Sequence, residues 1–591
     1  MEWNDITDKR DFAEFIDVQY RHLTYLIYFR KIENLYTSFE IPKKSGGTRL
    51  INSPKSELKS VQKRIAKKLE EYFFDLESQG LVSTKLSHGF TKSKSIITNS
   101  ESHRNKRILL NIDIENFFPS FHFGRVVGFF EKNKHLKLPR EVAIFISQLV
   151  CYDGSLPQGS PSSPIITNLI CQILDFRISK LAKSFSLSYS RYADDMTFST
   201  NDEKFLDRFE DFLREISRVI KQAGFELNKE KTRLQTRQSK QLVTGLVVNK
   251  KINVQRKFYK DSRAMAYNLY KKGEFFIEGE KGSKKQLLGR FNFIDQLEKY
   301  NNRIQEEARL KNDYIYQQKN LLITQNEFRS DLDYLNKLTA KEREYRKLLF
   351  YYHFFDTEYP VIVTEGKTDS RYIKAALKKH YSQYPNLVSR NDSGQFRFHL
   401  TFLRRTPLLK YYFRFFKDGA DQMKNLSNFW TGEENHKIFP NYSKYFKNLT
   451  GRDAACPVIF LFDNELSFQK NKRPISEFIK HIFPNDSDRN QVVSELSQEN
   501  KYNIIDNLYL LTHPSETQKE EIEDLFEENI LHHKIDGRSF SKKSNFNKSE
   551  YYGKNEFSNY VLSNYKNINF QKFIPMLDNL NKLIEDYKSN R

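Results

Sequence analysis

The stretch "SRYADDMTFST", residues 190–200, places two acids side by side within text that otherwise reads as strand. Tyr192 precedes the pair Asp194 and Asp195, and apolar and β-branched residues follow it. Because successive side chains on a strand point to opposite faces, only a tight hairpin lets neighbouring carboxylates reach one common partner. We therefore predict a hairpin here, with a divalent metal as the partner of the two acids.

A third acid lies in "NIDIENFFPSF", residues 111–121, where Asp113 ends an apolar strand. A lone aspartate in such a place is usually a cap or a turn residue. Three buried carboxylates without a cation would repel one another and lose hydration at a cost of several kcal/mol. Together with Asp194 and Asp195, Asp113 predicts a two-metal site of the kind that catalyses phosphoryl transfer.

The composition points to a polyanionic partner. The chain has 591 residues, too many for one core, and carries a formal net charge of +22 with 33 Tyr and 50 Phe. Cations that bind phosphates and rings that stack on bases are the two halves of a nucleic-acid surface. We expect nucleic acid as the partner and two to four domains.

Other classes of protein are disfavoured. Three cysteines, Cys151, Cys171 and Cys456, are too few and too scattered for a disulfide framework or a zinc site. The N-terminal text "MEWNDITDKRDFAEF" has no apolar core of a signal peptide, and no uncharged run approaches the length of a membrane span. We expect a soluble cytoplasmic protein without a membrane partner.

The chain divides into two α/β signals joined by helical text. In residues 106–250 strand-like runs alternate with helical text, and residues 251–300 are basic and helical in pattern. Residues 300–350 lack Gly and Pro, which predicts a long helix or helix pair between two domains. A second α/β signal begins at "YPVIVTEGKTDSRYIKAAL", residues 359–377, and "CPVIFLFDNEL", residues 456–466, repeats its run of apolar residues followed by an acid. Such runs predict a buried parallel sheet with its chemistry at the strand ends.

Three ordered motifs resemble the palm of reverse transcriptases: "NIDIENFFPSF", "LPQGSPSSPIITNLI" at 156–170 and "YADD" at 192–195. In addition, "IPKKSGGTRLINSP" at 41–54 resembles the fingers motif, which the pattern predicts as two strands around Gly46 and Gly47. The resemblance implies an RNA-directed DNA polymerase that uses deoxynucleotides and two Mg²⁺ ions.

The resemblance also assigns roles to single residues. Asp113, Asp194 and Asp195, with the carbonyl of Ile114, would be the catalytic metal ligands. Phe118 would exclude a ribose 2'-OH. The alternative role for Phe118 is ordinary core packing, because Phe117 is adjacent and only one of the two rings can face the site. The remaining nucleotide-binding residues would be Lys43, Arg49, Gln158 and Gly159.

Two further segments resemble the hallmarks of retron reverse transcriptases. A box from Asn99 to His103 lies before the first palm strand, with Ser100 in place of the family's alanine, and a Val-Thr-Gly triplet follows the palm. The resemblance implies a bacterial cytoplasmic enzyme that binds its own structured noncoding RNA and copies part of it into a branched RNA–DNA product, called msDNA. The RNA-binding residues would be Asn99, His103, Val243, Thr244, Gly245, Arg256 and Lys257.

The second α/β signal resembles a Toprim domain, the metal-binding fold of topoisomerases, primases and certain nucleases. Its catalytic and metal-binding residues would be Glu365, Asp463 and Glu465, with Asp369 as a further ligand, and it would hold one or two Mg²⁺ ions. We expect Asp463 and Glu465 on one side of an extended segment. The family's Asp-x-Asp is here Asp463-Asn464-Glu465, which leaves the metal preference open. Whether Asp369, Glu523 or Asp524 completes the site is also open.

The expected architecture is a multidomain protein of α/β and α+β class, with a right-hand polymerase followed by a Toprim-like parallel domain. The expected domains are fingers and palm in 1–250, a helical thumb in 251–300, a helical linker in 301–355 and the Toprim-like nuclease in 356–591. The nuclease would act in anti-phage defence, and the protein would form a higher-order oligomer with its RNA–DNA product. The alternative is an intron- or CRISPR-associated reverse transcriptase whose C-terminal domain is a non-catalytic nucleic-acid clamp.

Overall fold

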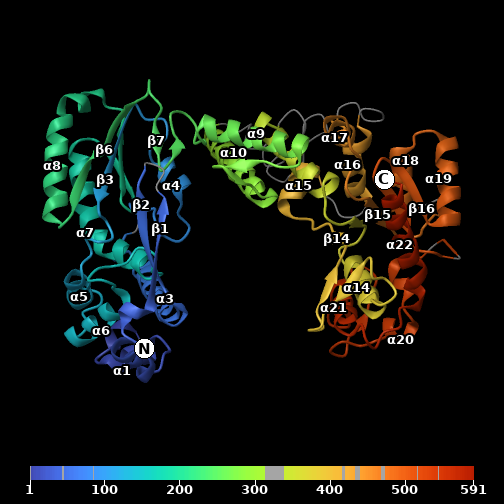
Figure 1. Cartoon of the computed structure of the whole chain (residues 1–591), viewed down its shortest axis with the longest axis horizontal. Coiled ribbons are helices and arrows are strands. Elements are labelled where there is room, and N and C mark those ends of the chain that lie inside the picture. Colours follow the sequence, from blue (N-terminus) through green and yellow to red (C-terminus); the bar gives the residue numbers. More distant parts are fainter. Residues whose placement is uncertain are drawn as a thin grey trace. The chain divides into compact units, whose positions relative to one another are not determined.

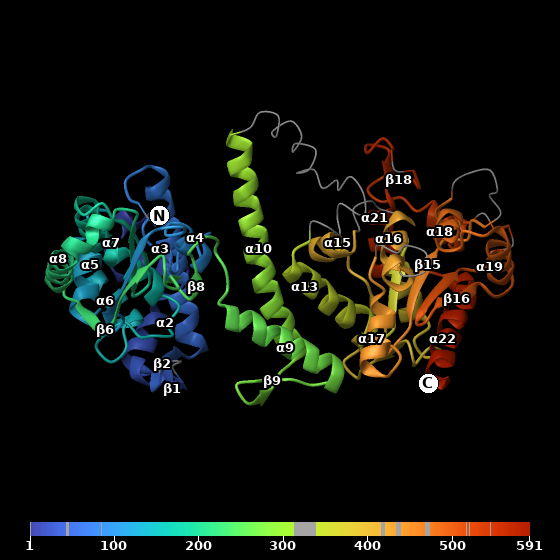
Figure 2. The same ribbon diagram turned by 90° about the horizontal axis from the view of Figure 1, so that it is seen from above.

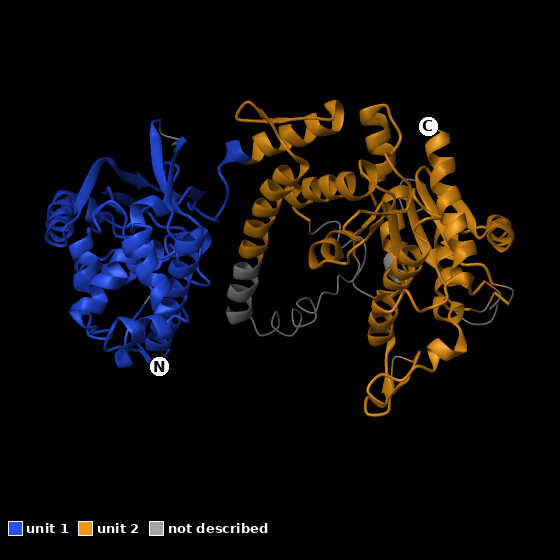
Figure 3. Ribbon diagram, turned by 60° about the horizontal axis from the view of Figure 1, so that its bottom comes forward, with its two compact units in different colours: residues 1–258 blue, residues 259–591 orange. Residues whose placement is uncertain are grey.

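The structure is a computed structural model, and it describes residues 2–42, 46–83, 85–312, 338–414, 420–432, 439–466, 473–515, 517–518, 520–543 and 545–590. The chain forms two compact units, residues 1–258 (unit 1) and residues 259–591 (unit 2), which are coloured separately in Figure 3. Each unit is described by itself.

Unit 1 is built on a four-stranded antiparallel sheet in the order β4-β5-β3-β6, seen at the left of Figure 1. The strands are β3 (Ile108–Glu115), β4 (Ser188–Tyr192), β5 (Asp195–Thr200) and β6 (Glu226–Thr236). The hairpin predicted around the paired acids is confirmed, because β4 and β5 pair directly and Tyr192 lies opposite Asp195. Ala193 takes a positive φ of 57° in the turn between them. The same register places Asp113 of β3 opposite Asp195.

Helices pack against one face of this sheet because their apolar sides share one core with it. Strand residues such as Leu110, Ile112 and Phe198 pack with buried residues of these helices in a single cluster. The larger helices are α3 (Ser56–Ser78), α5 (Phe123–Lys132), α6 (Arg140–Val150), α7 (Ser163–Ser184) and α8 (Phe209–Gln222). The shorter ones are η1 (Trp3–Asp5), α1 (Lys9–Phe15), α2 (Tyr20–Thr24), η2 (Tyr25–Phe29), η3 (Ile32–Leu35), α4 (Ile96–Glu101) and η4 (Glu203–Arg208).

Two hairpins extend from unit 1. Strands β1 (Tyr36–Pro42) and β2 (Thr48–Pro54) pair antiparallel, which confirms the strands predicted around Gly46 and Gly47. Strands β7 (Leu242–Val243) and β8 (Leu246–Val247) are joined by Thr244 and Gly245. Both turn residues have positive φ, 44° and 85°, the combination that a two-residue hairpin turn requires.

Unit 2 contains a five-stranded sheet in the order β14-β11-β15-β17-β16. Its strands are β11 (Val361–Thr364), β14 (Thr401–Phe402), β15 (Val458–Phe462), β16 (Lys501–Ile505) and β17 (Leu508–Thr512). The first four in spatial order are parallel, and β16 at the edge is antiparallel. Every residue of β11 and β15 is buried, so the predicted buried parallel strands are confirmed.

Helices cover both faces of the unit 2 sheet. Along β15, Val458, Phe460 and Phe462 belong to one apolar cluster, and the intervening Ile459 and Leu461 belong to another. The first cluster includes residues of α15 (Pro407–Phe413), α16 (Ala420–Thr431), α17 (Tyr442–Thr450), α18 (Pro474–Ile482) and α19 (Asp486–Glu499). The second includes residues of α14 (Asp369–Lys379), η6 (Ile522–Leu525), α21 (Lys554–Ser563), η7 (Gln571–Phe573) and α22 (Ile574–Ser589).

The helices predicted as thumb and linker also contribute to unit 2 (Figure 2). Residues of α9 (Arg256–Lys272) and α10 (Lys284–Asn312) share the first cluster with α13 (Ala340–Phe350) and the π-helical η5 (Tyr351–Phe355). The part of the predicted linker that forms α13 and η5 therefore packs into the core of unit 2. Residues 313–337 of the predicted linker lie outside the described residues.

The other elements of unit 2 are short: β9 (Phe276–Ile277), β10 (Glu280–Lys281), β12 (Val388–Arg390), β13 (Phe396–Phe398), α20 (Glu528–Leu531), β18 (Ser539–Phe540) and β19 (Tyr551–Tyr552). No helix within the described ranges combines the length and the apolar character needed to span a membrane.

Candidate functional site

A cleft of about 840 Å³ in unit 1 gathers residues that are far apart in the sequence. Its walls include residues of the β1–β2 hairpin, the four-stranded sheet and the β7–β8 hairpin. Eight residues that the sequence singled out line it: Arg49, Asp113, Phe118, Gln158, Asp194, Asp195, Thr244 and Gly245.

The three acids meet because of the strand register. Asp113, 7% exposed, ends β3 directly opposite Asp195 at the start of β5. The N–H of Ile114 donates to the carbonyl oxygen of Asp194 at 3.1 Å, which ties the hairpin turn to β3. The role predicted for the carbonyl of Ile114 stays a prediction.

The electrostatics of these acids call for a cation. Loss of hydration, with the charges of Asp194 and Asp113, raises the pKa of Asp195 to about 7, although part of its surface reaches solvent. Loss of hydration and Asp113 likewise raise the pKa of Asp194. The ammonium of Lys231 lies 2.9 Å from Asp113 Oδ1, and this hydrogen bond raises the pKa of Lys231. An ammonium thus partly neutralises a cluster that is otherwise negative.

The donor set fits magnesium, because Mg²⁺ prefers carboxylate and carbonyl oxygens. Within the described ranges, no three acidic, imidazole or thiol side chains are already arranged to hold a metal ion. Binding would accordingly require the acids to close around the ion and Lys231 to leave Asp113.

The two adjacent phenylalanines take different roles. Phe117 is 4% exposed in the core, whereas Phe118 lines the cleft and contacts Phe90 with ring centroids 6.4 Å apart. Arg49 lies exposed on β2 in the same cleft. Lys43 lies outside the described residues. Phe118 also packs against the core of unit 1, and its role in sugar selection stays a prediction.

The structure explains the glycine at position 159 by backbone packing, whereas the sequence predicts a nucleotide-binding role for it. Its φ is +123°, and a Cβ there would lie 2.8 Å from the carbonyl oxygen of Asn52. The Asn52 N–H donates to the carbonyl of Gln158 at 2.8 Å. Glycine is needed at this position so that β2 of the fingers hairpin can approach, whether or not a nucleotide also lies against it.

The box before the palm is buried. His103 is 0% exposed, with Nδ1 2.7 Å from Ser199 Oγ and Nε2 2.7 Å from Ser190 Oγ. Ser190 in turn donates to Asn99 Oδ1 at 2.5 Å, and Asn99 is also 0% exposed. The RNA contacts predicted for Asn99 and His103 stay predictions, but any effect on RNA would be indirect, because both side chains hold α4 against the hairpin β4–β5.

The two segments that resemble retron hallmarks contact each other. Ser100 Oγ donates to the carbonyl of Val243 at 3.2 Å, and Thr244 Oγ1 donates to the carbonyl of Ile96 at 3.4 Å. Val243 is fully buried, whereas Thr244 and Gly245 line the cleft. Arg256 and Lys257 are exposed at the start of α9. Of the predicted RNA-binding residues, the turn and these two cations remain accessible.

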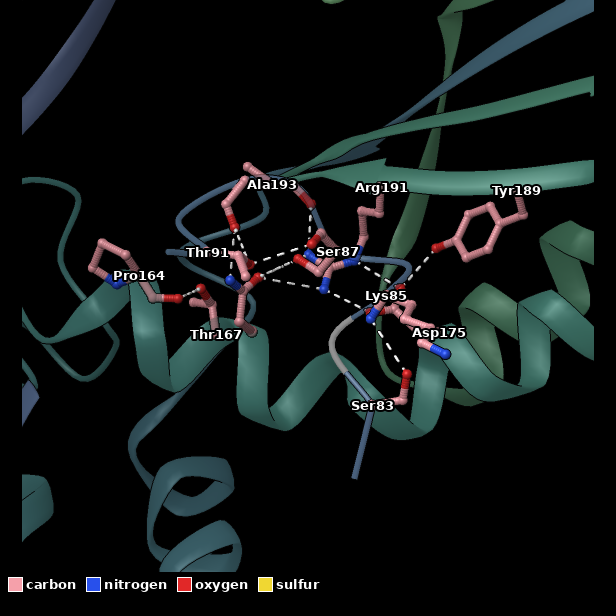
Figure 4. Close-up of polar contacts among 12 residues, drawn as sticks. Ser83, Lys85, Ser87, Thr91, Pro164, Thr167, Asp175, Tyr189, Arg191 and Ala193 are labelled. Atoms are coloured by element: carbon pink, nitrogen blue, oxygen red, sulfur yellow. Dashed lines mark hydrogen bonds and ion pairs between the residues drawn. The ribbon is translucent and has the colours of Figure 1, made fainter. Parts of the chain in front are cut away.

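The sequence reasoning missed a buried ion pair behind the paired acids (Figure 4). Arg191 is 0% exposed; its Nη2 lies 2.7 Å from Asp175 Oδ2 and its Nε 2.8 Å from Asp175 Oδ1. Tyr189 Oη donates to Asp175 Oδ1 at 2.7 Å. Arg191 Nη1 donates to the carbonyl of Ala193 at 2.9 Å, so the ion pair holds the residue that precedes Asp194.

A sequence signal for this pair existed. The run "LSYSRY" places Arg191 within a predicted strand, and an arginine that a strand buries needs an acidic partner. The identity of that partner, sixteen positions away on α7, could not be read from the spacing.

Unit 2 has its own acidic cleft, of about 630 Å³. Glu365 follows β11 and Asp463 follows β15, and these strands are parallel neighbours, so the two acids meet at one edge of the sheet as predicted. Asp369 at the start of α14 joins them in the cleft. The same cleft is lined by Lys367, Arg405, Lys542, Lys543 and Lys554.

These acids are strongly desolvated. Burial, with Asp369 and Glu465 nearby, raises the pKa of Glu365 to about 7, and its Oε2 is buried without a hydrogen-bond partner among the described residues. Burial also raises the pKa of Asp369 and raises that of Asp463 well above its usual range. Asp369 Oδ2 accepts from the Gly366 N–H at 2.7 Å, and Asp463 Oδ1 accepts from the Ile522 N–H at 2.9 Å. An orphaned carboxylate oxygen beside two further acids fits a bound cation.

Glu465 departs from the expectation of an extended segment. Its N–H donates to the carbonyl of Asp463 at 3.1 Å, so the chain turns directly after β15. Glu465 does not line the cleft; it lies 2.7 Å from Arg473.

The two other candidate acids are also paired. Glu523, 0% exposed, lies 3.1 Å from Lys554, and Asp524 pairs with Lys542. Of the three acids left open by the sequence, only Asp369 lines the cleft.

Comparisons with known proteins bear on unit 1. The family model described as "Reverse transcriptase (RNA-dependent DNA polymerase)" matches residues 41–248. The chain is similar to the retron Ec86 reverse transcriptase of Escherichia coli, at 36% identity over 40% of this chain and 70% of that protein. It is also similar to the retron Mx162 reverse transcriptase of Myxococcus xanthus, at 33% identity over 48% of this chain and 62% of that protein. A solved telomerase structure from Candida albicans aligns at 13% identity over 53% of this chain and 63% of the telomerase chain, with a TM-score of 0.30. This TM-score is too low to relate the two folds.

Proposed function

The chain belongs to the retron reverse transcriptase family, and we propose that unit 1 copies a structured noncoding RNA of its own into a branched RNA–DNA product. One observation carries this proposal: Asp113, Asp194 and Asp195 converge in a cleft that also presents Arg49 and Phe118. Acids for metals, a cation for a triphosphate and a ring for sugar selection are the parts that template-directed DNA synthesis requires.

Each residue of the cleft has a defined task in this proposal. Asp113, Asp194 and Asp195 would hold Mg²⁺, which when bound supplies electrostatic stabilisation of the phosphoryl-transfer transition state. Arg49 would bind the phosphates of the incoming nucleotide, and Phe118 would occupy the space that a ribose 2'-OH needs. Arg191 would keep the turn that carries Asp194 in place through Ala193.

Recognition of the RNA would use the turn at Thr244 and Gly245 and the cations of α9. The turn lines the cleft, while Arg256, Lys257, Lys260 and Arg263 are exposed along the helix. Exposed cations bind RNA backbone phosphates without regard to sequence, so specificity would fall to the turn.

Recovery of the branched product tests this function. The chain is expressed with the genomic segment that adjoins its gene, and nucleic acid is analysed by denaturing gel before and after RNase treatment. We expect a DNA band that shortens on RNase treatment and that is absent with Asp194→Asn. A DNA product without attached RNA, or a product from Asp194→Asn, would argue for the alternative of a reverse transcriptase outside the retron type of reaction.

For unit 2 we propose a Toprim-like, metal-dependent nuclease that acts as the effector of an anti-phage system. The support is the placement of Glu365 and Asp463 at the carboxyl ends of neighbouring parallel strands, beside the half-buried Lys554. In this proposal the lysines and Arg405 would bind the backbone phosphates of the substrate. Glu365, with a pKa of about 7, can take up or release a proton near neutral pH.

The rival for unit 2 is a clamp without catalytic activity, and cellular assays separate the two. Glu365→Gln and Asp463→Asn should leave the branched product unchanged while abolishing protection in phage plating. Size measurements of the purified complex, with and without RNase and DNase, would test the proposed oligomer with its RNA–DNA product. Wild-type protection by both variants would favour the clamp.

A further inference from the structure

A groove of about 950 Å³ lies on unit 1, apart from the cleft that contains Asp113, Asp194 and Asp195. None of the roles proposed above uses this groove. It runs along α7 and is bounded by the end of α5 and by Leu81, Val82, Ser83 and Leu86. Among the described residues, none lines both this groove and the cleft of the three aspartates in unit 1.

The exposed side of α7 is apolar where a surface helix is normally polar. Leu169 and Leu174 face the core of unit 1, yet Ile173 and Phe176 on the groove side are 67% and 71% exposed. Across the groove Leu81 is 52% exposed. A contiguous exposed apolar strip of this kind marks an interaction surface.

The rim of the groove is positively charged. Lys132, Lys134, Arg177, Lys180 and Lys183 are all exposed, and within the described part of the chain none of them has an ion-pair partner. The one acid among the lining residues, Asp175, is 6% exposed and already paired with Arg191. The groove therefore presents an uncompensated ring of cations around an apolar floor.

From this combination we infer that the groove binds an acidic amphipathic helix of a protein partner. The apolar side chains on α7 are spaced by three residues, which matches the i, i+3, i+4 stripe of a helix laid along it. Acids on the outer edges of such a helix would face the five cations, which gives orientation and speeds association. Nucleic acid fits less well, because stacking on bases needs rings and the exposed floor includes aliphatic Leu81 and Ile173.

Fluorescence anisotropy of the full-length protein tests the inference. The probe is a fluorescein-labelled 18-residue peptide with Leu at positions i, i+3, i+4 and i+7 and Glu on its other faces. A second peptide has Lys in place of every Glu. The variants are Ile173→Ser/Phe176→Ser, which removes the apolar strip, and Lys180→Glu/Lys183→Glu, which reverses two rim charges.

The control variant Lys59→Glu/Lys63→Glu carries the same charge change on exposed positions of α3. We expect each groove variant to bind the acidic peptide at least tenfold more weakly than the wild type and the control. The Lys peptide should bind at least tenfold more weakly to the wild type. Primer extension by all variants should stay within twofold of the wild type, which shows that unit 1 is folded.

Three results would overturn the inference. One is binding of the acidic peptide to the groove variants as tightly as to the wild type. Another is equal binding of the Glu and Lys peptides. The third is a tenfold loss of affinity for a labelled single-stranded RNA 20-mer in Ile173→Ser/Phe176→Ser but not in the control variant. That result would make the groove an RNA-binding surface.

Discussion

The hydroxyl of Ser100 donates a hydrogen bond to the backbone carbonyl of Val243 at 3.2 Å, across 143 positions of sequence. This bond and its neighbour from Thr244 to Ile96 join two segments that flank the palm in the sequence. The box from Asn99 to His103 thus supports the turn at Thr244 from behind, and only the turn faces the cleft.

Thr244→Ala should separate RNA recognition from catalysis. The hydroxyl anchors the turn at the cleft, outside the three acids, so we expect extension of oligo(dT) on poly(rA) to stay within twofold of the wild type. Synthesis of the branched product from the RNA encoded beside the gene should fall at least tenfold. Ser239→Ala, an exposed change nearby, is the control. Equal losses on both templates would show that the turn is only structural.

The buried pair of Arg191 and Asp175 should govern kcat more than KM. Removing one partner leaves a buried charge and costs roughly 3–5 kcal/mol of stability. In Arg191→Met/Asp175→Asn both charges are removed, and an acceptor for Tyr189 remains, so we expect a folded protein. Its Ala193 carbonyl lacks the arginine donor, and kcat for primer extension should fall at least tenfold with KM for dNTP within threefold.

The matching comparison for this pair is thermal unfolding. Each single variant, Arg191→Met and Asp175→Asn, should unfold at a lower temperature than the double variant. If the double variant keeps full kcat, the pair serves stability alone.

His103 should make unit 1 sensitive to acid. Burial lowers the pKa of His103 to about 3 in the folded protein, whereas the ordinary value is 6.5. Below pH 6.5 the unfolded chain binds a proton that the folded chain cannot, so stability is lost as the pH falls from 6.5 towards 3. The loss is at most about 1.4 kcal/mol per pH unit, or about 2 kcal/mol at pH 5.

The comparison of wild type with His103→Gln isolates this effect from other buried histidines. Urea unfolding at pH 7.5, 6.0 and 5.0 should show the wild type's advantage in unfolding free energy shrinking as the pH falls. A constant difference across this range would mean that His103 titrates alike in the folded and unfolded states, so that its burial does not lower its pKa.

Phe118→Ala should relax the choice of sugar. Its ring lines the cleft, and its removal opens space beside the site of synthesis. We expect the ratio of GTP to dGTP incorporation to rise at least tenfold, measured by single-nucleotide extension. Phe74→Ala, at a position that is 65% exposed and lies outside the cleft, should leave the ratio unchanged. An unaltered ratio in Phe118→Ala would assign the ring to packing.

Asp463→Asn should stabilise unit 2 without magnesium and make it insensitive to the ion. Burial and the neighbouring acids raise the pKa of Asp463, so the ionised form is costly without a cation, and an amide in its place can still accept from the Ile522 N–H. We expect a higher Tm than wild type in EDTA. Addition of 10 mM Mg²⁺ should raise the wild-type Tm only. A similar rise in both proteins would place the ion elsewhere.

The acids of unit 1 could be predicted from sequence because the chemistry of paired carboxylates on a hairpin is narrow. The edge position of Glu365 and Asp463 followed from apolar runs that admit only a buried parallel sheet. The extended segment expected to hold Asp463 and Glu465 on one side is not formed, because residues two apart share a face only while the strand continues, and β15 ends at Phe462. Gly159 and Arg191 have partners distant in sequence, and spacing carries no information on such contacts.

The absence of Gly and Pro around Leu348 predicts a helix, which we interpret as part of a linker between domains. A linker and a core helix share that property, and burial alone distinguishes them. In the structure Leu348 and Leu349 are each 1% exposed.

The core shared by α9, α10 and α13 sets where this protein can be cut and recombined. A polymerase ended at residue 300 would carry α9 and half of a core, with Leu287 and Phe291 stripped of the side chains that cover them. We expect such a fragment to expose part of this apolar core to solvent. A boundary for truncation or exchange therefore lies at residues 249–255, before α9, so that α9 and α10 stay with the unit whose core they share.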